Sequence, residues 1–187
     1  METLTKGYNR KCKDGVGGVQ YIALYPFVPY HRFQIITDGE TLVSHPTTEI
    51  FRFYPVGDIS VNENQSEDVG GKFYDQTINF KLQKSEEYNN IMKLLGQDYG
   101  IIYQDRRGYY KILGLYNGLE CGSINYSSGS GKSDFNGFTL SFTGKEVRNS
   151  LFIDDLADAG FVVSGFEFRI TEDGEFKITE NNDKRIV

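Results

Sequence analysis

Gly131-Lys132-Ser133 is the segment of this sequence whose residue types and spacing come nearest to a chemical site. It matches the end of a phosphate-binding loop, in which backbone amides wrap the phosphate, Lys reaches it and Ser binds Mg²⁺. That loop requires another Gly five residues before Gly131, and this sequence has Tyr126 there. A helix should follow, whereas residues 135–142 have the pattern of a strand. We therefore predict a turn here and no nucleotide site.

The histidines and cysteines are too few and too scattered to predict a metal or nucleophile site. His31 and His45 both neighbour proline-containing turns. Cys12 and Cys121 have no second Cys or His at metal-ligand spacing. A catalytic triad would have to be built on these two histidines alone. We interpret the histidines as surface or turn residues and the cysteines as reduced thiols, and we expect no metal and no cofactor.

Acidic residues cluster at Asp154, Asp155 and Asp158 and again at Glu67-Asp68. Glycosidases place two carboxylates roughly 5–10 Å apart across a sugar cleft, which adjacency in sequence does not establish. The pattern of an EF-hand calcium loop is absent. We interpret these residues as solvated turns and predict that the chain is not an enzyme.

Tyr109, Tyr110 and Tyr116 are aromatic residues of the kind that line a carbohydrate platform. Such residues more often pack a sheet, and we favour that role. A carbohydrate- or receptor-binding β-sandwich stays open as the alternative function.

Composition favours one β-rich domain of 187 residues, because Phe (14), Tyr (13) and Gly (21) suit pleated sheets and tight turns. The formal net charge is −6, and 20 basic residues are scattered among 26 acidic ones. Tight nucleic-acid binding needs basic residues clustered on one face, so we do not expect it. No apolar run approaches the ~20 residues that span a bilayer, and the N-terminus lacks the apolar region of a signal peptide. We expect no membrane partner.

Alternating apolar and polar residues predict about ten strands. The clearest is residues 72–82, where Tyr74, Gln76, Ile78, Phe80 and Leu82 share a mostly apolar face. Asp38-Gly39 predicts the turn of a hairpin. The other strands are expected at residues 19–25, 48–55, 57–61, 100–104, 109–115, 119–126 and 135–144, with a terminal hairpin of residues 160–171 and 174–180.

One helix is predicted, between a cap at Ser85 and a closing Gly96. Apolar residues recur on one face of it at Tyr88, Ile91, Met92 and Leu95.

A polar stretch between two predicted strands is our candidate subunit interface. It is too polar to pack internally, so we expect a loop that contacts a neighbouring subunit instead of its own domain. The stretch comprises Val61, Asn62, Glu63, Asn64, Gln65, Ser66, Glu67, Asp68, Val69, Gly70 and Gly71.

A set of turn-and-strand phrases resembles the small structural proteins of crAss-like and related Bacteroidetes tailed phages. The phrases are Lys6-Gly7-Tyr8, Cys12-Lys13-Asp14-Gly15-Val16-Gly17-Gly18, Gly70-Gly71-Lys72-Phe73-Tyr74-Asp75-Gln76, Gly114-Leu115-Tyr116-Asn117-Gly118-Leu119, Gly131-Lys132-Ser133-Asp134-Phe135-Asn136-Gly137-Phe138, Phe142-Thr143-Gly144-Lys145-Glu146 and Leu151-Phe152-Ile153-Asp154-Asp155-Leu156. The resemblance extends to about residue 156 and brings no functional residues with it, because these proteins work through surfaces.

The resemblance implies a mainly β, tail-tube-like sandwich or barrel with one flanking α-helix. We expect a single domain over residues 1–187, with an extended arm at 1–18 and a C-terminal hairpin extension at 157–187 that the resemblance does not include. The implied function is a virion protein of the neck or tail, forming a homo-oligomeric ring of roughly six or twelve copies. Its partners would be neighbouring portal, neck and tail proteins, and genomic DNA would pass through without sequence-specific binding. The alternative then becomes a carbohydrate- or receptor-binding β-sandwich of a phage tail.

Overall fold

The protein is mainly β, as the sequence predicts. The computed structural model describes residues 18–84, 88–131, 134–164, 166–170 and 176–180. In this part of the chain the elements are β1 (Val19–Pro26), the 3-10 helix η1 (Pro29–Phe33), β2 (Ile36–Asp38), β3 (Thr41–Ser44), β4 (Thr48–Phe53), β5 (Ser60–Asp68), β6 (Gly71–Gln83), α1 (Tyr88–Met92), β7 (Asp98–Asp105), β8 (Tyr110–Leu113), β9 (Leu119–Ser127), β10 (Gly137–Glu146), β11 (Leu151–Ile153), β12 (Phe161–Val163), β13 (Phe166–Ile170) and β14 (Phe176–Glu180).

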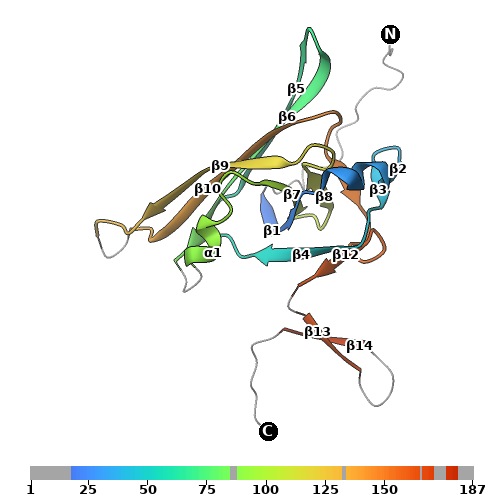
Figure 1. Cartoon of the computed structure of the whole chain (residues 1–187). Coiled ribbons are helices and arrows are strands. Elements are labelled where there is room, and N and C mark those ends of the chain that lie inside the picture. Colours follow the sequence, from blue (N-terminus) through green and yellow to red (C-terminus); the bar gives the residue numbers. More distant parts are fainter. Residues whose placement is uncertain (1–17, 85–87, 132–133, 165, 171–175, 181–187) are drawn as a thin grey trace.

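Twelve of the strands form one sheet, in the order β2-β3-β11-β8-β7-β9-β10-β6-β5 (Figure 1). β1 adds to β7 on one side and to β4 on the other, and β12 pairs with β4. β13 and β14 pair with each other.

Two apolar cores lie on the two faces of β1. Ile22 and Leu24 belong to a core that β6, β9 and β10 complete, whereas Ala23 and Tyr25 belong to a core that β3, β11 and β12 complete. Successive residues of a strand point to opposite faces, so β1 is buried from both sides. The sheet is therefore folded over on itself in layers, as a sandwich is.

Strand β6 spans the molecule and carries the alternation expected of it. Gln76, Ile78, Phe80 and Leu82 are buried. Phe80 stacks on Phe142 of β10 with the ring centroids 5.8 Å apart. The predicted hairpin at Asp38-Gly39 is also confirmed, because β2 pairs with β3 and Gly39 has a φ of 57°.

The predicted helix is shorter than expected, and the face predicted to be buried is correct at Ile91 but wrong at Met92 and Leu95. Ile91 and Leu94 pack against the first core, whereas Met92 and Leu95 are 39% and 50% exposed. The helix ends at Met92, and the chain then continues as a turn, so the spacing of a regular helix no longer applies to Leu95. The predicted cap at Ser85 and the side chain of Tyr88 lie outside the described residues.

The ends of the chain are described only in part. The predicted arm at 1–18 lies outside the described residues except for Gly18. Residues 171–175, which include the connection of the predicted terminal hairpin, also lie outside them. Across the described residues, no helix has the length and apolar character needed to cross a bilayer.

Candidate assembly surface

The proposed interface stretch of residues 61–71 is a β-hairpin arm, so the prediction of a loop was wrong. Val61–Asp68 belong to β5, Val69 and Gly70 form the turn, and Gly71 begins β6. The ladder runs from Ser60 opposite Asn79 to Asp68 opposite Gly71. Because backbone hydrogen bonds to β6 satisfy the polar chain, the segment needs no apolar core of its own. The arm rises away from the body of the molecule (Figure 1).

The base of the arm is fixed to its own domain by Glu63. Its Oε2 accepts hydrogen bonds from Gln76 Nε2 at 2.8 Å and from the Ser150 amide at 2.7 Å. Gln76 in turn accepts from the Gly114 amide at 3.0 Å through its Oε1. The expectation that the stretch contacts only neighbours is therefore wrong at Glu63.

Beyond Glu63 the arm is exposed except for the half-buried Ser66. Asp68 closes its turn by accepting from the Gly70 amide at 2.7 Å.

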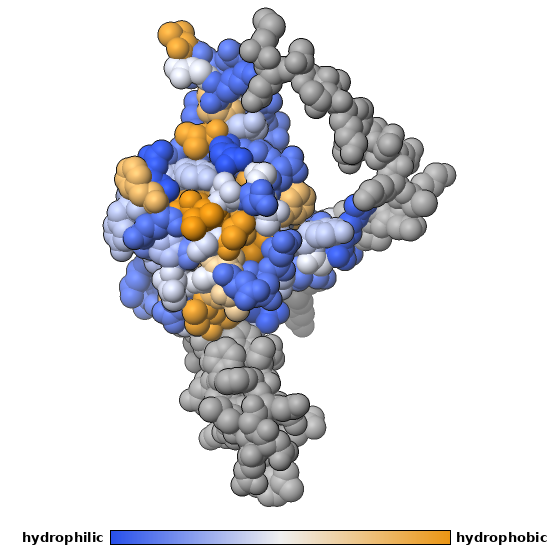
Figure 2. Space-filling model, turned by 90° about the vertical axis from the view of Figure 1, so that its right-hand side faces the viewer, coloured by the Kyte–Doolittle hydropathy of each residue, from blue (hydrophilic) through white to orange (hydrophobic). Residues whose placement is uncertain are grey.

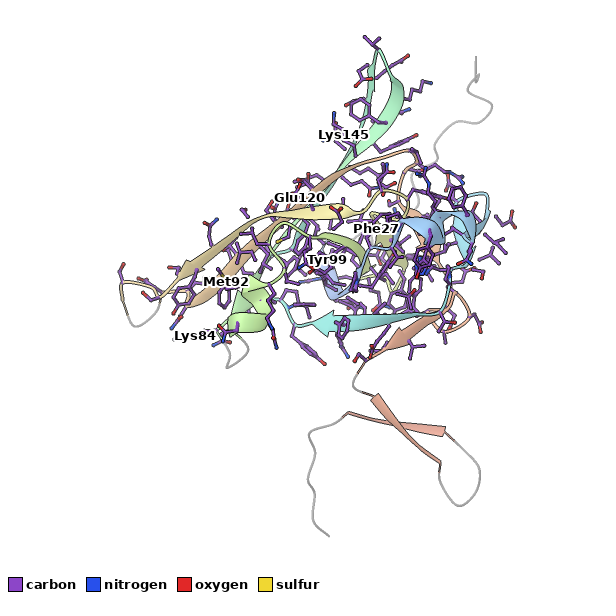
Figure 3. All side chains as sticks on the ribbon, in the orientation of Figure 1. Phe27, Lys84, Met92, Tyr99, Glu120 and Lys145 are labelled. Atoms are coloured by element: carbon purple, nitrogen blue, oxygen red, sulfur yellow. The ribbon has the colours of Figure 1, made fainter. Side chains whose placement is uncertain are left out.

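A second hairpin, formed by β9 and β10, projects from the opposite end of β6. Gly137, near the tip of this hairpin, lies opposite Gln83 at the last residue of β6. The β5–β6 turn lies at the other end, next to Gly71 at the first residue of β6. Figure 3 places Lys145 near the base of the first arm and Lys84 and Met92 near the other end. In the tip, the Asp134 carboxylate accepts from the amides of Ser130 at 2.8 Å and Gly131 at 2.6 Å. These hydrogen bonds lower the pKa of Asp134.

The amides of Ser130 and Gly131 lie in the segment where a phosphate loop was considered and rejected. Ser130 and Gly131 direct their N–H groups at an internal carboxylate, and a strand follows in place of a helix. Lys132 and Ser133 lie outside the described residues.

The four strands β9, β10, β6 and β5 form a segment of sheet that is open along both sides. β5 ends the strand order, so its outer edge has no neighbouring strand in the described structure. β9 pairs with β7 only at Leu119 and Glu120, and Cys121 exchanges backbone hydrogen bonds with Gly96 and Gln97. Residues 122–127 of β9 therefore form a second open edge. Such edges are templates for pairing with another chain.

One face of this segment carries mostly small polar side chains. Buried residues of β6 and β10 alternate with it and point into the first core. The cross-strand registers place the following on the polar face: Ser60, Asn62, Asn64, Ser66, Thr77, Asn79, Ser123, Asn125, Ser127, Thr139, Ser141 and Thr143. The same face also carries Phe73, two lysines (Lys81 and Lys145) and three acidic residues (Asp68, Asp75 and Glu120).

No family model, no curated protein and no solved structure matches the chain.

A second exposed surface is apolar. It follows η1, β2 and β3, where Tyr30, Phe33, Ile36 and Val43 are all exposed, Phe33 by 88%. Figure 2 views the molecule from this side and shows apolar residues gathered in the middle of the face. Exposed apolar patches often mark contact sites, so this is a further candidate contact surface.

The histidines lie together and are packed among aromatic rings. His45 lies in the connection between β3 and β4, as expected of a turn residue, but it is 4% exposed and so is not on the surface. Its ring is 5.3 Å from that of His31 and 4.9 Å from that of Phe161. Burial lowers the pKa of His45 to about 4, although a hydrogen bond of its Nδ1 with the Pro46 carbonyl opposes the shift. A neutral, enclosed ring of this kind serves packing.

The other residues considered for chemistry, Cys121 and the acidic cluster around Asp155, have structural roles in the protein. Burial raises the pKa of Cys121 to about 11, which leaves it a protonated thiol. Asp155 accepts hydrogen bonds from the amides of Ala157 and Asp158 within its own turn. Within the described part of the chain, no three His, Cys, Asp or Glu side chains lie close enough together to hold a metal ion.

The three tyrosines do not share one exposed surface. Tyr109 is 57% exposed, whereas Tyr110 and Tyr116 pack against the second core.

The open edges were the feature that sequence reasoning missed. A signal was present in the alternating Ser, Asn and Thr residues of the two segments that became β9 and β10.

Proposed function

We propose that this chain is a structural subunit of a phage neck or tail ring, in which copies join edge to edge and line the channel for DNA. The observation that carries the proposal is the pair of open edges on one four-stranded segment. A C2 dimer would use one edge twice, whereas two different edges allow head-to-tail contacts that close into a ring.

Strand directions suit this arrangement. Each neighbouring pair among β9, β10, β6 and β5 is antiparallel, so β9 and β5 run in opposite directions. When all copies point the same way around a ring, β5 of one copy meets β9 of the next as an antiparallel pair. The sheet then continues across the interface without reversing any subunit.

If Ser60 of one copy lies opposite Ser127 of the next, neighbouring copies are offset by an amount that suits a closed barrel. Ser60 is level with Asn79, and Ser127 is level with Gln83, four residues further along β6. That offset is about 14 Å along the strands, against about 19 Å across four strands. The ratio corresponds to a strand tilt of about 35°, within the range of closed barrels.

Side-chain alternation is compatible with this register and disfavours shifts by an odd number of residues. With Ser60 opposite Ser127, Asn62 faces Asn125 and Asn64 faces Ser123, so polar residues meet polar residues on one face. On the other face Val61 meets Tyr126. A shift of one residue would bring polar and core-facing residues together, which the period of a strand disfavours.

The polar face supports a channel for DNA. Its side chains are mostly Ser, Thr and Asn, and three acidic residues outnumber two lysines, so the face offers no cluster of cations to hold phosphates. A duplex could slide past such a wall. The resemblance to phage neck and tail proteins gives the biological setting.

A charge-pair experiment tests the proposed interface. Asn62→Lys with Asn125→Lys in one chain should prevent ring formation, because like charges would face each other at every interface. Asn62→Lys with Asn125→Glu should restore it. Within one copy these positions are separated by β6 and β10, so only contacts between copies distinguish the two variants. Equal assembly of both variants would contradict the edge pairing.

A further inference from the structure

The exposed apolar side chains on η1, β2 and β3 form a patch that needs a partner. They are Tyr30, Phe33, Ile36 and Val43, and their exposed fractions run from 49% at Val43 to 88% at Phe33. Figure 2 shows apolar residues gathered in the middle of this face. Contiguous apolar surface of this kind often marks a contact site on a monomer. A partner for the patch must bring an apolar group of its own.

The tip of the β5–β6 arm carries such a group. Val69 lies in the turn between the two strands and is fully exposed. Asp68 accepts a hydrogen bond from the Gly70 amide at 2.7 Å, which fixes the turn around Val69. A preformed turn loses little freedom when it docks. Figure 1 shows the arm rising away from the body, with its end apart from β2 and β3, so the tip can reach a second copy.

The arm tip carries opposite charges on its two strands. Glu67 on β5 lies opposite Lys72 on β6, and both are exposed. Asp68 adds a second carboxylate on the β5 side. The tip therefore presents Val69 between an acidic side and a basic side.

The patch is flanked by charges in the complementary arrangement. Arg32 is exposed on η1. The turn between β2 and β3 carries the exposed Asp38 and Glu40, and Arg148 hydrogen-bonds to the same turn, so one net negative charge remains there. A tip docked with β5 toward η1 and β6 toward this turn would bring its acidic side to Arg32 and its basic side to the acidic turn. Such complementarity favours one orientation of docking.

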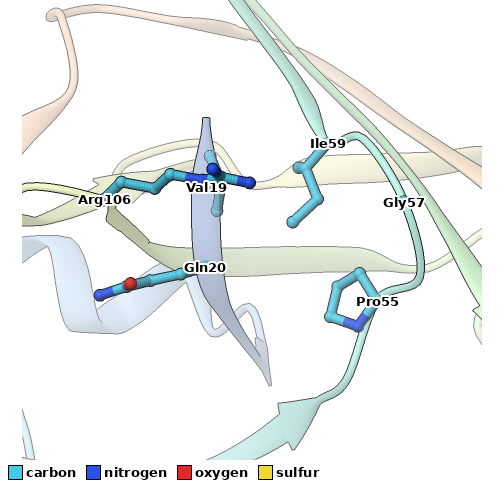
Figure 4. A pocket seen from close by; sticks show the side chains of 6 residues that line it. All are labelled: Val19, Gln20, Pro55, Gly57, Ile59 and Arg106. Atoms are coloured by element: carbon cyan, nitrogen blue, oxygen red, sulfur yellow. The ribbon is translucent and has the colours of Figure 1, made fainter. Parts of the chain in front are cut away.

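A pocket of about 580 Å³ beside the start of β5 is a less suitable receptor for the tip (Figure 4). It is lined by Val19, Gln20, Pro55, Gly57, Ile59 and Arg106. Val19 and Ile59 are half-buried and already pack against the first core, so they leave little apolar surface for an anchor. The patch, whose four apolar side chains are all exposed, is the better match for Val69.

We propose that the patch on η1, β2 and β3 binds the β5–β6 arm tip of a second copy, with Val69 as the apolar anchor and Arg32 facing Glu67. The contact uses neither the β9 edge nor residues 60–64 of β5, so it goes beyond the proposed ring and does not depend on it. Each contact is small, but copies assembled in a ring would make it many times over, which strengthens the connection.

Disulfide trapping between two different chains tests the contact directly. One chain carries Val69→Cys and the other carries Val43→Cys, both with Cys12→Ser, which leaves only the buried Cys121 besides them. The chains differ in a tag, so the mixed product can be told from products of one chain. One arm tip covers less than the roughly 800 Å² per partner of a standard interface, so trapping suits a weak single contact. Mild oxidation should give the mixed product.

Two controls replace the Val43→Cys chain. Val162→Cys lies on β12 and is almost as exposed as Val43, 47% against 49%, and should give at least about tenfold less mixed product. Gln20→Cys tests the pocket in the same way and should give equally little.

Charge exchange tests the orientation of the docked tip. Arg32→Glu in the patch chain should lower the yield of mixed product at least about threefold, because like charges would face each other. Glu67→Arg in the arm chain should then restore it. Lys93→Glu in the patch chain changes an exposed cation in the turn after α1 and should alter the yield by less than about twofold. All variants should keep the circular dichroism spectrum of the parent.

The outcomes separate this inference from the ring itself. Equal yields from Val43→Cys and its controls, or a loss with Arg32→Glu that Glu67→Arg does not restore, would overturn the docking. Rings without the mixed product would leave the ring intact and overturn the docking alone. Mixed product from a chain that forms no rings would support the docking and contradict the ring.

Discussion

Two buried polar residues, Gln76 and His45, show how single side chains specify this fold. The side-chain amide of Gln76 bonds groups that are distant in sequence, and His45 Nδ1 bonds the adjacent Pro46 carbonyl, so both are hydrogen-bonded within the core. The alternation of β6 predicted that Gln76 faces inward. No sequence pattern predicted its partners, because Glu63 and Gly114 meet it only through tertiary contacts.

His45 makes stability depend on pH. In the folded protein its pKa is about 4, against about 6.5 when unfolded, so folding favours the neutral ring. The stabilisation is full above pH 6.5 and is lost as pH falls toward 4. Between pH 7 and 4.5 the advantage of the parent over His45→Gln should shrink by about 2 kcal/mol. Denaturant melts at both pH values measure this. An unchanged difference would mean that the ring is solvated.

At the scale of elements, strand patterns were easier to predict than the helix. The long period-2 alternation of β6 is a strong signal, whereas α1 is five residues long and ends before a second turn can confirm its face. Tertiary packing decided which side of residues 91–95 is buried. The polar arm was missed because a hairpin that projects from the body needs no apolar face, and periodicity was the signal that sequence reasoning used.

The contrast between Leu94 and Leu95 tests the corrected helix. Leu94→Ala should lower the free energy of unfolding by about 1–3 kcal/mol, because this side chain packs against the first core. Leu95→Ala removes a half-exposed side chain and should cost less than about 1 kcal/mol. Equal losses in urea melts would show that the two residues are buried alike.

The β5–β6 arm can be shortened without disturbing its base. Replacing residues 66–73 with an Asn-Gly turn joins Gln65 to its partner Tyr74 and keeps the Glu63–Gln76 hydrogen bond. We expect a folded protein that still forms rings, because residues 60–64, which pair with β9 in the proposed register, remain. Loss of rings in particle images would show that the contacts between copies lie further along the arm.

At the scale of the whole molecule, the segment β9-β10-β6-β5 has two different open edges in the described structure. The apolar cores account for the stability of one copy, and in the proposed ring the open edges form the contacts and the polar face forms the channel wall. The sequence predicted a β-rich domain and one interface segment. The second edge depends on β9 being displaced from β7 after Glu120, which is a property of sheet topology and has no local pattern.

The mass and shape of the purified full-length chain test the central claim most directly. Mass photometry and negative-stain class averages should show closed, hollow rings whose mass is a fixed multiple of 21.3 kDa. The walls should be continuous, as expected when β5 and β9 of neighbouring copies share one sheet. A particle of 21.3 kDa at every concentration, or a closed two-fold dimer, would contradict the account.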